Sequence, residues 1–285
     1  MWGDSIKIGL IGAGKVGFSL GKYLLMHGHM VLGYYSRNIN SAKEAAAFTK
    51  TKFYDNLACI VEDSDTLFIT VPDGEIGHVW DYIRNLPIKN KNICHCSGLI
   101  SSNAFFNAKK YGAFVYSVHP LYAISDKYHS YQTLAKAYFA IEGSVEHLSM
   151  MQQLFVSMGN PVVLLSASQK PLYHAAAVFV SNQMLALADL GVDVLTTCGF
   201  AKEDAQKALY PLMADNILKL SETSIEDALT GPVERNDVQT VQTHMTALSK
   251  EEAEIYQLLS KRLIQIAKRK HPHRDYTDME REIGV

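Results

Sequence analysis

The feature that most constrains this chain is a glycine-rich turn that begins at residue 12. An apolar run at residues 6–11 predicts a strand, and the pattern of residues 18–27 predicts a helix. The turn between them reads Gly12-Ala13-Gly14-Lys15-Val16-Gly17. A G-x-G-x-x-G sequence between a strand and a helix is typical of a dinucleotide site, and the alternative is a turn with a structural role alone.

Each glycine has a physical reason in such a site. Gly12 permits the sharp turn, Gly14 has no side chain to block a pyrophosphate, and Gly17 lets the helix pack closely on the strand. The helix N-terminus offers unpaired N–H groups and a positive dipole end to the phosphates. We therefore expect Gly12, Gly14, Lys15, Val16 and Gly17 to contact the cofactor.

The residues after the second predicted strand indicate which dinucleotide binds. Residues 30–35 form that strand, and Ser36 and Arg37 follow it. An NAD-preferring site places Asp or Glu about twenty residues past the glycines, where it accepts from the ribose 2′-hydroxyl. A serine hydroxyl and a guanidinium can instead bind a 2′-phosphate, which a carboxylate would repel. The sequence favours NADP(H); the alternative is a solvated arginine that starts a loop.

Composition narrows the class of protein. The 285 residues suffice for two domains, and 48% hydrophobic with 20% charged residues is typical of a soluble globular protein. A net charge of −2 gives no reason to expect nucleic acid or an anionic membrane as a partner. No apolar run approaches the roughly 20 residues that span a bilayer, and the chain enters its first strand without a signal peptide. We expect a cytoplasmic protein.

The four cysteines do not make a disulfide framework in a chain of this size. The sequence Cys94-His95-Cys96 suggests a metal pair, but it lies in a strand-like run whose alternating residues point to opposite faces. No second pair stands at a zinc-site spacing. We expect reduced structural cysteines and no metal.

The chain pattern divides into two halves near residue 165. Residues 1–165 alternate between strands and helices, which predicts a Rossmann fold, a doubly wound parallel sheet with helices on both faces. The further predicted strands are 65–71, 92–96, 114–118, 137–141 and 161–165, and the helices are 41–50, 76–85 and 145–158.

Residues 166–285 form the second predicted domain, which is all-helical. A long apolar helix is predicted from Ser168, as N-cap, to residue 198, with Pro171 in its first turn and Gly199 at its end. Further helices are predicted at 202–221, 236–248 and 250–269, and the basic tail 268–274 is expected to be solvated.

Residues that directly follow strands face the ligand in open α/β sheets. Val71, Pro72 and Asp73 are therefore expected to contact the cofactor, although Asp73 could instead cap the next helix. Ser97 gives a hydroxyl near the expected nicotinamide, and His119 could bind substrate or bond within a turn.

The long helix carries the catalytic candidates. Lys170 and His174 are four residues apart and share one face; Ser181 lies close to it, and Asn182 sits about a third of a turn round from Lys170. The residues between are almost wholly apolar, so these polar groups require partners or a ligand. A ketone that gains hydride becomes an alkoxide, which needs a positive proton donor. Lys170 is the natural donor, with His174 a second donor or the acid itself; the alternative is a snorkelling Lys170 and a His174 bonded in the core.

A second polar cluster occupies residues 230–237. Its Gly-Pro pair marks a turn, and Asn236 or Asp237 can cap the helix that follows, on which Thr240 lies. Arg235 is the only arginine between Arg84 and Arg262, so it is the leading candidate to bind a substrate carboxylate, with Asp237 and Thr240 beside it. The alternative is a turn braced by an Arg–Asp pair.

These motifs together resemble one group of Rossmann proteins, in which an NAD(P)-binding domain precedes a helical domain long catalogued as of unknown function. The resemblance covers nearly the whole chain and rests on residues 12–17, the His119-Pro120 pair, residues 170–177, Ser181-Asn182 and residues 230–237. It implies a C-terminal domain similar to that of 6-phosphogluconate dehydrogenase. Some members of the group resemble an alternative type of ketopantoate reductase, which implies a role in pantothenate synthesis.

More distantly, the chain is similar to ketopantoate reductase, 3-hydroxyisobutyrate dehydrogenase and pyrroline-5-carboxylate reductase. In the first two, a lysine that opens the long interdomain helix serves as acid/base, with an asparagine one turn later. Lys170 matches that lysine, and His174 stands where the asparagine would be.

The sequence thus predicts an NADPH-dependent reductase of a small 2-oxo acid, with 2-dehydropantoate the best single candidate. The substrate would lie between the domains, its carboxylate held by Arg235 or Asn182. Alternatives are a 3-hydroxy-acid dehydrogenase, an imine reductase, or a non-catalytic NADP-sensing protein. The apolar long helix suggests a homodimer through the helical domain, although a buried monomeric core would look the same.

Overall fold

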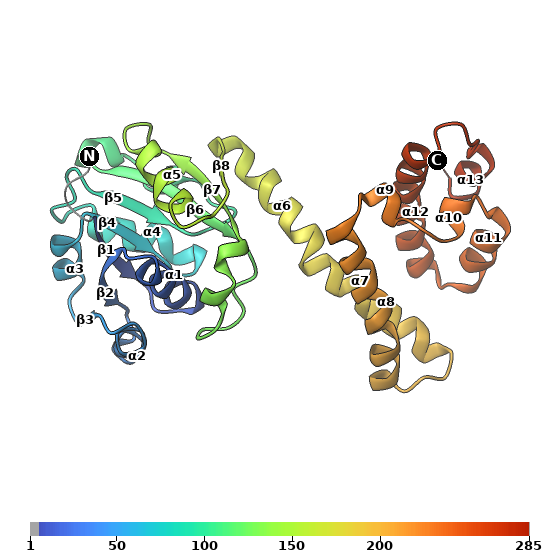
Figure 1. Cartoon of the computed structure of the whole chain (residues 1–285), viewed down its shortest axis with the longest axis horizontal. Coiled ribbons are helices and arrows are strands. Elements are labelled where there is room, and N and C mark those ends of the chain that lie inside the picture. Colours follow the sequence, from blue (N-terminus) through green and yellow to red (C-terminus); the bar gives the residue numbers. More distant parts are fainter. Residues whose placement is uncertain (1–5, 285) are drawn as a thin grey trace. The chain divides into compact units, whose positions relative to one another are not determined.

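The computed structural model describes residues 6–284 of the chain (Figure 1). These divide into two compact units, Met1–Val180 and Ser181–Val285. The predicted domain boundary, between residues 165 and 166, lies earlier in the chain than the division between these two units. The assignment of separate functions to residues 1–165 and 166–285 stays a prediction. The first five residues and the last lie outside the described part of the chain.

An eight-stranded sheet forms the centre of the first unit, with strand order β3-β2-β1-β4-β5-β6-β7-β8. The predicted Rossmann sheet is confirmed. Its strands are β1 Lys7–Ile11, β2 Met30–Tyr35, β3 Lys52–Tyr54, β4 Thr66–Ile69, β5 Asn92–His95, β6 Phe114–Leu121, β7 Tyr138–Gly143 and β8 Val162–Leu164.

The sheet differs from the predicted one at β7. All neighbouring strands pair in parallel except β6 and β7, which pair antiparallel. Residues 122–137 between them contain two short 3₁₀ turns, Ser130–Gln132 and Leu134–Lys136. A parallel return needs a long crossover, usually a helix, and a segment without one returns the chain in the opposite direction.

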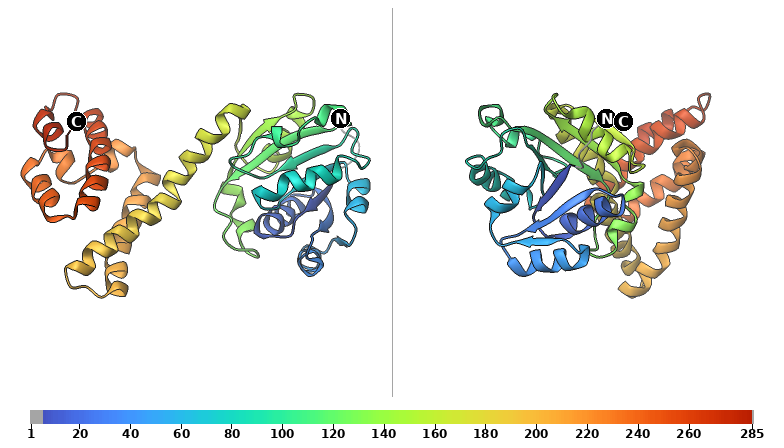
Figure 2. Two further views of the ribbon diagram at one scale, coloured as in Figure 1. Left: turned by 180° about the vertical axis from the view of Figure 1, so that it is seen from behind. Right: turned by 60° about the vertical axis from the view of Figure 1, so that its left-hand side comes forward.

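Helices cover both faces of this sheet. One face packs against α1 Lys15–Met26, α2 Ile39–Thr49 and α5 Leu148–Val156, and the other against α3 Leu57–Asp63 and α4 Asp73–Ile83. In the view from behind, α4 lies in front of the sheet (Figure 2). Strand residues alternate between the two cores, as in β4, where Phe68 faces one core and Leu67 and Ile69 face the other.

The predicted long helix is interrupted. A 3₁₀ turn, Ala167–Gln169, is capped by Ser166 rather than Ser168, and α6 runs from Lys170 to Val180 with Pro171 in its first turn. The helix is broken at Ser181, and α7 covers Asn182–Thr197. The expected helical phase from Lys170 to Asn182 is therefore wrong, because it assumed an unbroken helix.

One stretch, Ala167–Thr197, is long and apolar enough to cross a membrane by length and composition, and little of it is buried. The expectation that no apolar run approaches this length is therefore wrong, because an averaged window tolerates isolated polar residues. The core helix of a soluble protein passes the same test. The expected absence of a membrane partner stays a prediction.

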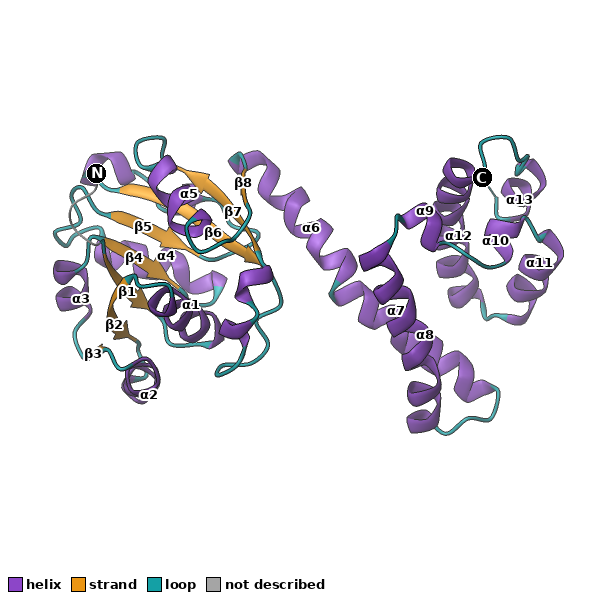
Figure 3. Ribbon diagram, viewed as in Figure 1, coloured by secondary structure: helices purple, strands orange, loops and turns teal. Residues whose placement is uncertain are grey.

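The described part of the second unit is all-helical, as predicted (Figure 3). Helix α8, Lys202–Glu222, packs against α7, and a small core forms around Val241, Ile264 and Tyr276. The other helices are α9 Ile225–Ala228, α10 Pro232–Arg235, α11 Val238–Ala247, α12 Lys250–Lys270 and α13 Thr277–Glu282.

Most of the basic residues 268–274 are exposed, as expected of a solvated segment, but several of them form ion pairs. Lys268 pairs with Glu280 at 2.6 Å and Arg269 with Glu226 at 2.6 Å. His271 contacts the carboxylate of Glu234. Acidic residues distant in the sequence supply these partners, which sequence spacing does not reveal.

Phe155→Ala is expected to destabilise the first unit. The Phe155 ring stacks on Phe139 with a centroid distance of 4.0 Å, and both side chains are fully buried. Truncation of such a side chain costs about 3–5 kcal/mol. Urea unfolding followed by the fluorescence of buried Trp80 measures the loss.

Phe53→Ala is the matched control, because the Phe53 side chain is 45% exposed. Its loss should stay within about 0.5 kcal/mol, as for most surface substitutions. Equal losses in the two variants would contradict a core role for the stacked pair.

Candidate functional site

The glycine turn lies at the carboxyl end of β1. Gly12 has φ +115°, and a Cβ there would lie 2.8 Å from the Thr70 backbone. A Cβ at Gly17 would lie 2.3 Å from the Gly12 carbonyl oxygen, whereas one at Gly14 would meet nothing within 4 Å. Gly12 and Gly17 are therefore required by packing, and Gly14 leaves an open surface.

Helix α1 starts directly after this turn. Gly14 is its N-cap, so no side chain caps its first N–H groups. An uncapped helix N-terminus beside an open glycine is a favourable place for a phosphate. The residues present fit a dinucleotide pyrophosphate here. Lys15 and Val16 open the helix at this point.

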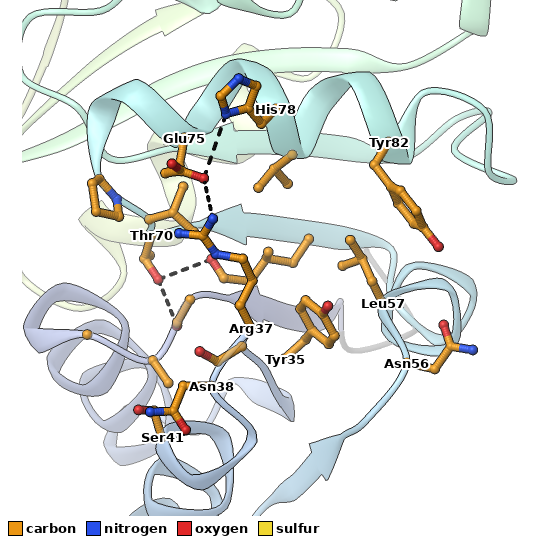
Figure 4. A pocket seen from close by; sticks show the side chains of 18 of the residues that line it. Tyr35, Arg37, Asn38, Ser41, Asn56, Leu57, Thr70, Glu75, His78 and Tyr82 are labelled. Atoms are coloured by element: carbon orange, nitrogen blue, oxygen red, sulfur yellow. Dashed lines mark hydrogen bonds and ion pairs between the residues drawn. The ribbon is translucent and has the colours of Figure 1, made fainter.

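A cavity of about 1160 Å³ continues from the turn along the ends of β1, β2 and β4 (Figure 4). Pockets for small ligands have volumes of about 300–1,000 Å³, so this one is large enough for a cofactor. Predicted cofactor residues that line it are Gly12, Gly14, Ser36, Arg37, Val71 and Pro72. Leu57, Tyr82 and Tyr35 add apolar and aromatic surface.

Arg37 lies over this cavity and points toward α4 (Figure 4). Its Nη1 is 2.8 Å from Oε2 of Glu75, and its side chain is 78% exposed. His78 lies on the same helix, with Nδ1 3.7 Å from Glu75 Oε2. Sequence reasoning missed Glu75, because its position opposite Arg37 depends on how α4 packs in the folded unit.

Ser41 and the N-terminus of α2 lie beside Arg37 in the same cavity. The Asn38 side chain caps α2 by accepting from the Asn40 N–H. A guanidinium, two hydroxyls including that of Ser36, and a helix N-terminus together suit a phosphate.

Lys170 is buried at the start of α6, where 1% of it is exposed. Its Nζ donates to the Ser97 carbonyl oxygen at 2.8 Å and to Ser117 Oγ at 2.6 Å. The alternative of a snorkelling lysine is wrong, because the ammonium group lies inside the protein, between the turn after β5 and the middle of β6. Burial lowers the pKa of Lys170 to about 8, against an opposing effect of the Glu142 carboxylate.

Ser97 connects this lysine to α4. Its Oγ donates to Asp73 Oδ2 at 2.7 Å and accepts from the Ile100 N–H at 2.9 Å. Asp73 is the first residue of α4, and Pro72, not Asp73, is the N-cap. The Ser97 hydroxyl thus holds the turn after β5, and its contact with substrate stays a prediction.

The two predicted histidines come together at Gly98. A Cβ on Gly98 would lie 2.7 Å from His174 Nδ1 and 2.9 Å from His119 Nε2. The His119 and His174 ring centroids are 6.5 Å apart. His174 Nδ1 is buried and has no hydrogen-bond partner in the described part of the chain.

Tyr173 completes this group, and sequence reasoning missed it. Its hydroxyl is 2.8 Å from His119 Nδ1. An aromatic residue in an apolar helix resembles a core residue, so no sequence pattern indicates this contact. Burial lowers the pKa of His119 to about 3, with the Lys170 charge acting in the same direction.

The remaining predicted residues belong to the second unit. Ser181 Oγ is 3.0 Å from Asn182 Oδ1 at the start of α7. Asp237 caps α11 by accepting from Thr240 N–H at 3.1 Å, and Thr240 Oγ1 donates to it at 2.7 Å. These Thr240 bonds lower the pKa of Asp237. Arg235 ends α10 and is exposed. Their roles toward substrate stay predictions.

Two family models match the chain. Residues 7–93 match the family described as "NADP oxidoreductase coenzyme F420-dependent", and residues 137–263 match "Domain of unknown function (DUF2520)". No curated protein matches the sequence. The first match confirms the prediction of NADP(H) as the cofactor.

Solved structures share the fold over nearly their whole length. Protein TM1727 from Thermotoga maritima is 23% identical, with a TM-score of 0.73 over 92% of this chain and 99% of that chain. An imine reductase from Pseudomonas sp. is 17% identical, with a TM-score of 0.64 over 93% and 98%. A reductive aminase from Aspergillus terreus, in complex with NADPH and ethyl-5-oxohexanoate, is 14% identical, with a TM-score of 0.64 over 98% and 99%.

Arg37→Ala is expected to weaken NADPH binding about 10- to 100-fold and to leave NADH binding unchanged. Loss of a hydrogen bond to a charged group costs about 1.5–3 kcal/mol, and NADH lacks the 2′-phosphate that Arg37 would bind. Fluorescence titration with each cofactor measures both dissociation constants. Arg281→Ala, whose side chain is 75% exposed on α13, is the control. Equal weakening of NADPH and NADH binding would show that Arg37 contacts a part of the molecule common to both cofactors, and not the 2′-phosphate.

Proposed function

We propose that this chain, an NADP-dependent oxidoreductase of the Rossmann superfamily whose C-terminal part contains a DUF2520 domain, reduces the carbonyl group of a small 2-oxo acid. The best single candidate is 2-dehydropantoate, whose reduction to pantoate is a step of pantothenate synthesis in the cytoplasm. The observation that carries the proposal is the buried ammonium of Lys170 beside His119 and His174.

A reductase of this kind needs a proton donor next to the reacting carbonyl. NADPH supplies the hydride. Among residues 6–284, Lys170 Nζ has two hydrogen-bond acceptors, which leaves one N–H for a substrate. Its pKa of about 8 keeps it protonated at neutral pH yet able to release the proton. His174, one turn along α6, is the second candidate for the donor.

The 2-oxo acid also needs a partner for its carboxylate. Arg235 supports this part of the proposal, because its guanidinium is exposed and has no acidic partner within 4 Å among residues 6–284. A planar guanidinium binds a carboxylate through two parallel bonds. Asn182 is the alternative, at the exposed start of α7.

Lys170→Ala is expected to lower kcat for the preferred 2-oxo acid about 100- to 10,000-fold, the usual contribution of a general acid. Oxidation of NADPH by a panel of 2-oxo acids and cyclic imines measures the rate of reduction. Reduction of NADP⁺ by 3-hydroxy acids measures the reverse reaction. In the unsubstituted protein the rate should fall as the pH rises through about 8, because Lys170 then loses the proton that it donates.

Lys207→Ala is the control, because Lys207 is an exposed residue of α8. Full turnover by Lys170→Ala would exclude Lys170 as the donor and leave His174. Preference for imines or hydroxy acids would replace the proposed substrate class. NADPH binding without turnover of any compound would favour a sensing protein.

We further propose that the helical domain forms a homodimer. Large apolar side chains are exposed on α7 and α8, namely Met184, Leu185, Leu187, Tyr210, Leu212, Ile217, Leu218 and Leu220. Single exposed apolar residues are common, but a concentration on two packed helices marks an interaction surface. A second copy is the simplest occupant, because most soluble oligomers pair identical surfaces.

Leu185→Glu is expected to shift the protein from dimer to monomer in sedimentation velocity, since a buried unpaired charge costs several kcal/mol. Leu258→Glu is the matched control: Leu258 is 66% exposed and Leu185 65%, but Leu258 lies on α12. A monomeric unsubstituted protein would overturn the proposal. Binding of the unsubstituted protein to lipid vesicles would indicate that a membrane, and not a second copy, covers the apolar residues of α7 and α8.

A further inference from the structure

His119 and Tyr173 form a side-chain pair across 54 residues of sequence. His119 lies in β6 and Tyr173 in the second turn of neighbouring α6, both within the first unit. The Tyr173 hydroxyl is 2.8 Å from His119 Nδ1, and the two rings are perpendicular, at 88°. One ring nitrogen of His119 is therefore engaged inside the protein.

The direction of this hydrogen bond follows from the protons that each group holds. Burial raises the pKa of Tyr173 to about 12, so the phenol keeps its proton at neutral pH. Burial and the Lys170 charge keep His119 neutral, with a single ring proton. Among the described residues, His119 is the polar group bonded to the Tyr173 hydroxyl. If Nδ1–H donated to the phenol oxygen, the phenol proton would lack an acceptor among the described residues, whereas a proton on Nε2 lets Tyr173 donate to Nδ1. The contact therefore favours Tyr173 as the donor and Nε2 as the protonated nitrogen.

The other nitrogen of His119 faces a position without a side chain. A Cβ on residue 98 would lie 2.9 Å from His119 Nε2, so a side chain at this position would crowd the nitrogen. The unpartnered Nδ1 of His174 lies 2.7 Å from the same point. Two imidazole nitrogens thus converge beside the carboxyl end of β5, where residues face the ligand in open α/β sheets.

We propose that Tyr173 is a positioning residue, which holds His119 with Nε2–H directed at the side of Gly98 that carries no side chain, and that this N–H donates to an oxygen of the 2-oxo acid. The second part rests on the proposed function. A neutral donor suits this place, because a second cation beside the Lys170 ammonium would be repelled. A donor oriented before substrate binds costs no reorganisation during the reaction.

The test is ¹⁵N NMR of the full chain with labelled histidine, without substrate. His119→Ala identifies the His119 resonances. In the unsubstituted protein, Nε2 should carry the proton and Nδ1 should resonate as a hydrogen-bond acceptor. In Tyr173→Phe, Nδ1 should move to the position of a nitrogen without that bond. A proton on Nδ1 in the unsubstituted protein, or an unchanged Nδ1 resonance in Tyr173→Phe, would overturn the proposal.

Kinetics test the second part. Tyr173→Phe should lower kcat for the preferred 2-oxo acid about tenfold, less than the 100-fold or greater loss of a deleted donor, and leave the KM for NADPH unchanged. Tyr210→Phe, 67% exposed on α8, is the control. An unchanged kcat with a changed Nδ1 resonance would overturn the role toward substrate. Failure of the proposed function would appear separately, as no turnover of any 2-oxo acid by the unsubstituted protein.

Discussion

The burial of the Lys170 ammonium is the constraint on which the candidate site depends. An unpaired charge inside a protein costs several kcal/mol, so this lysine requires the Ser97 carbonyl and the Ser117 hydroxyl as acceptors. Ser97 follows the carboxyl end of β5 and Ser117 lies in the middle of β6, so these bonds fix the start of α6 against the sheet. The Glu142 carboxylate, opposite Ser117 in the β6–β7 pair, opposes the lowering of the lysine pKa.

The same anchoring places the neighbouring polar groups. Residues three and four positions along a helix lie on the face of the first residue, so fixing Lys170 also fixes Tyr173 and His174. Tyr173 then meets His119, and His174 meets Gly98. The charges are divided among these groups: the lysine is the cation, and His119 stays neutral beside it. Burial is the main cause of the low pKa of His119, and the Lys170 charge acts in the same direction.

Local chemistry explains what could be predicted from the sequence. The glycine turn depends on backbone conformation and on close packing of adjacent segments, so its spacing is visible in the sequence. Ser36 and Arg37 directly follow a predicted strand, which placed them near the same turn. His119, Lys170 and His174 were candidates because of residue type and position, and all three lie together in the first unit. Their chemical roles stay predictions.

Contacts between distant segments explain what could not be predicted. Tyr173 and Glu75 have polar partners 54 and 38 positions away, a pairing that no helical or strand period reports. The short β3 and α3 offer too few residues for a periodic pattern. The antiparallel β7 depends on the path of residues 122–137, and the break at Ser181 has no proline or glycine to announce it.

Glu75 raises a question of selectivity at the cofactor cavity, because its carboxylate competes with a phosphate for Arg37. Magnitudes resolve it. The Arg37 side chain is 78% exposed, and an exposed ion pair contributes about 0.2–1 kcal/mol. A hydrogen bond from the same guanidinium to a phosphate contributes about 1.5–3 kcal/mol, and the hydroxyls of Ser36 and Ser41 can add to it. If the 2′-phosphate binds at Arg37 as proposed, its contact with the guanidinium would therefore prevail over the ion pair with Glu75.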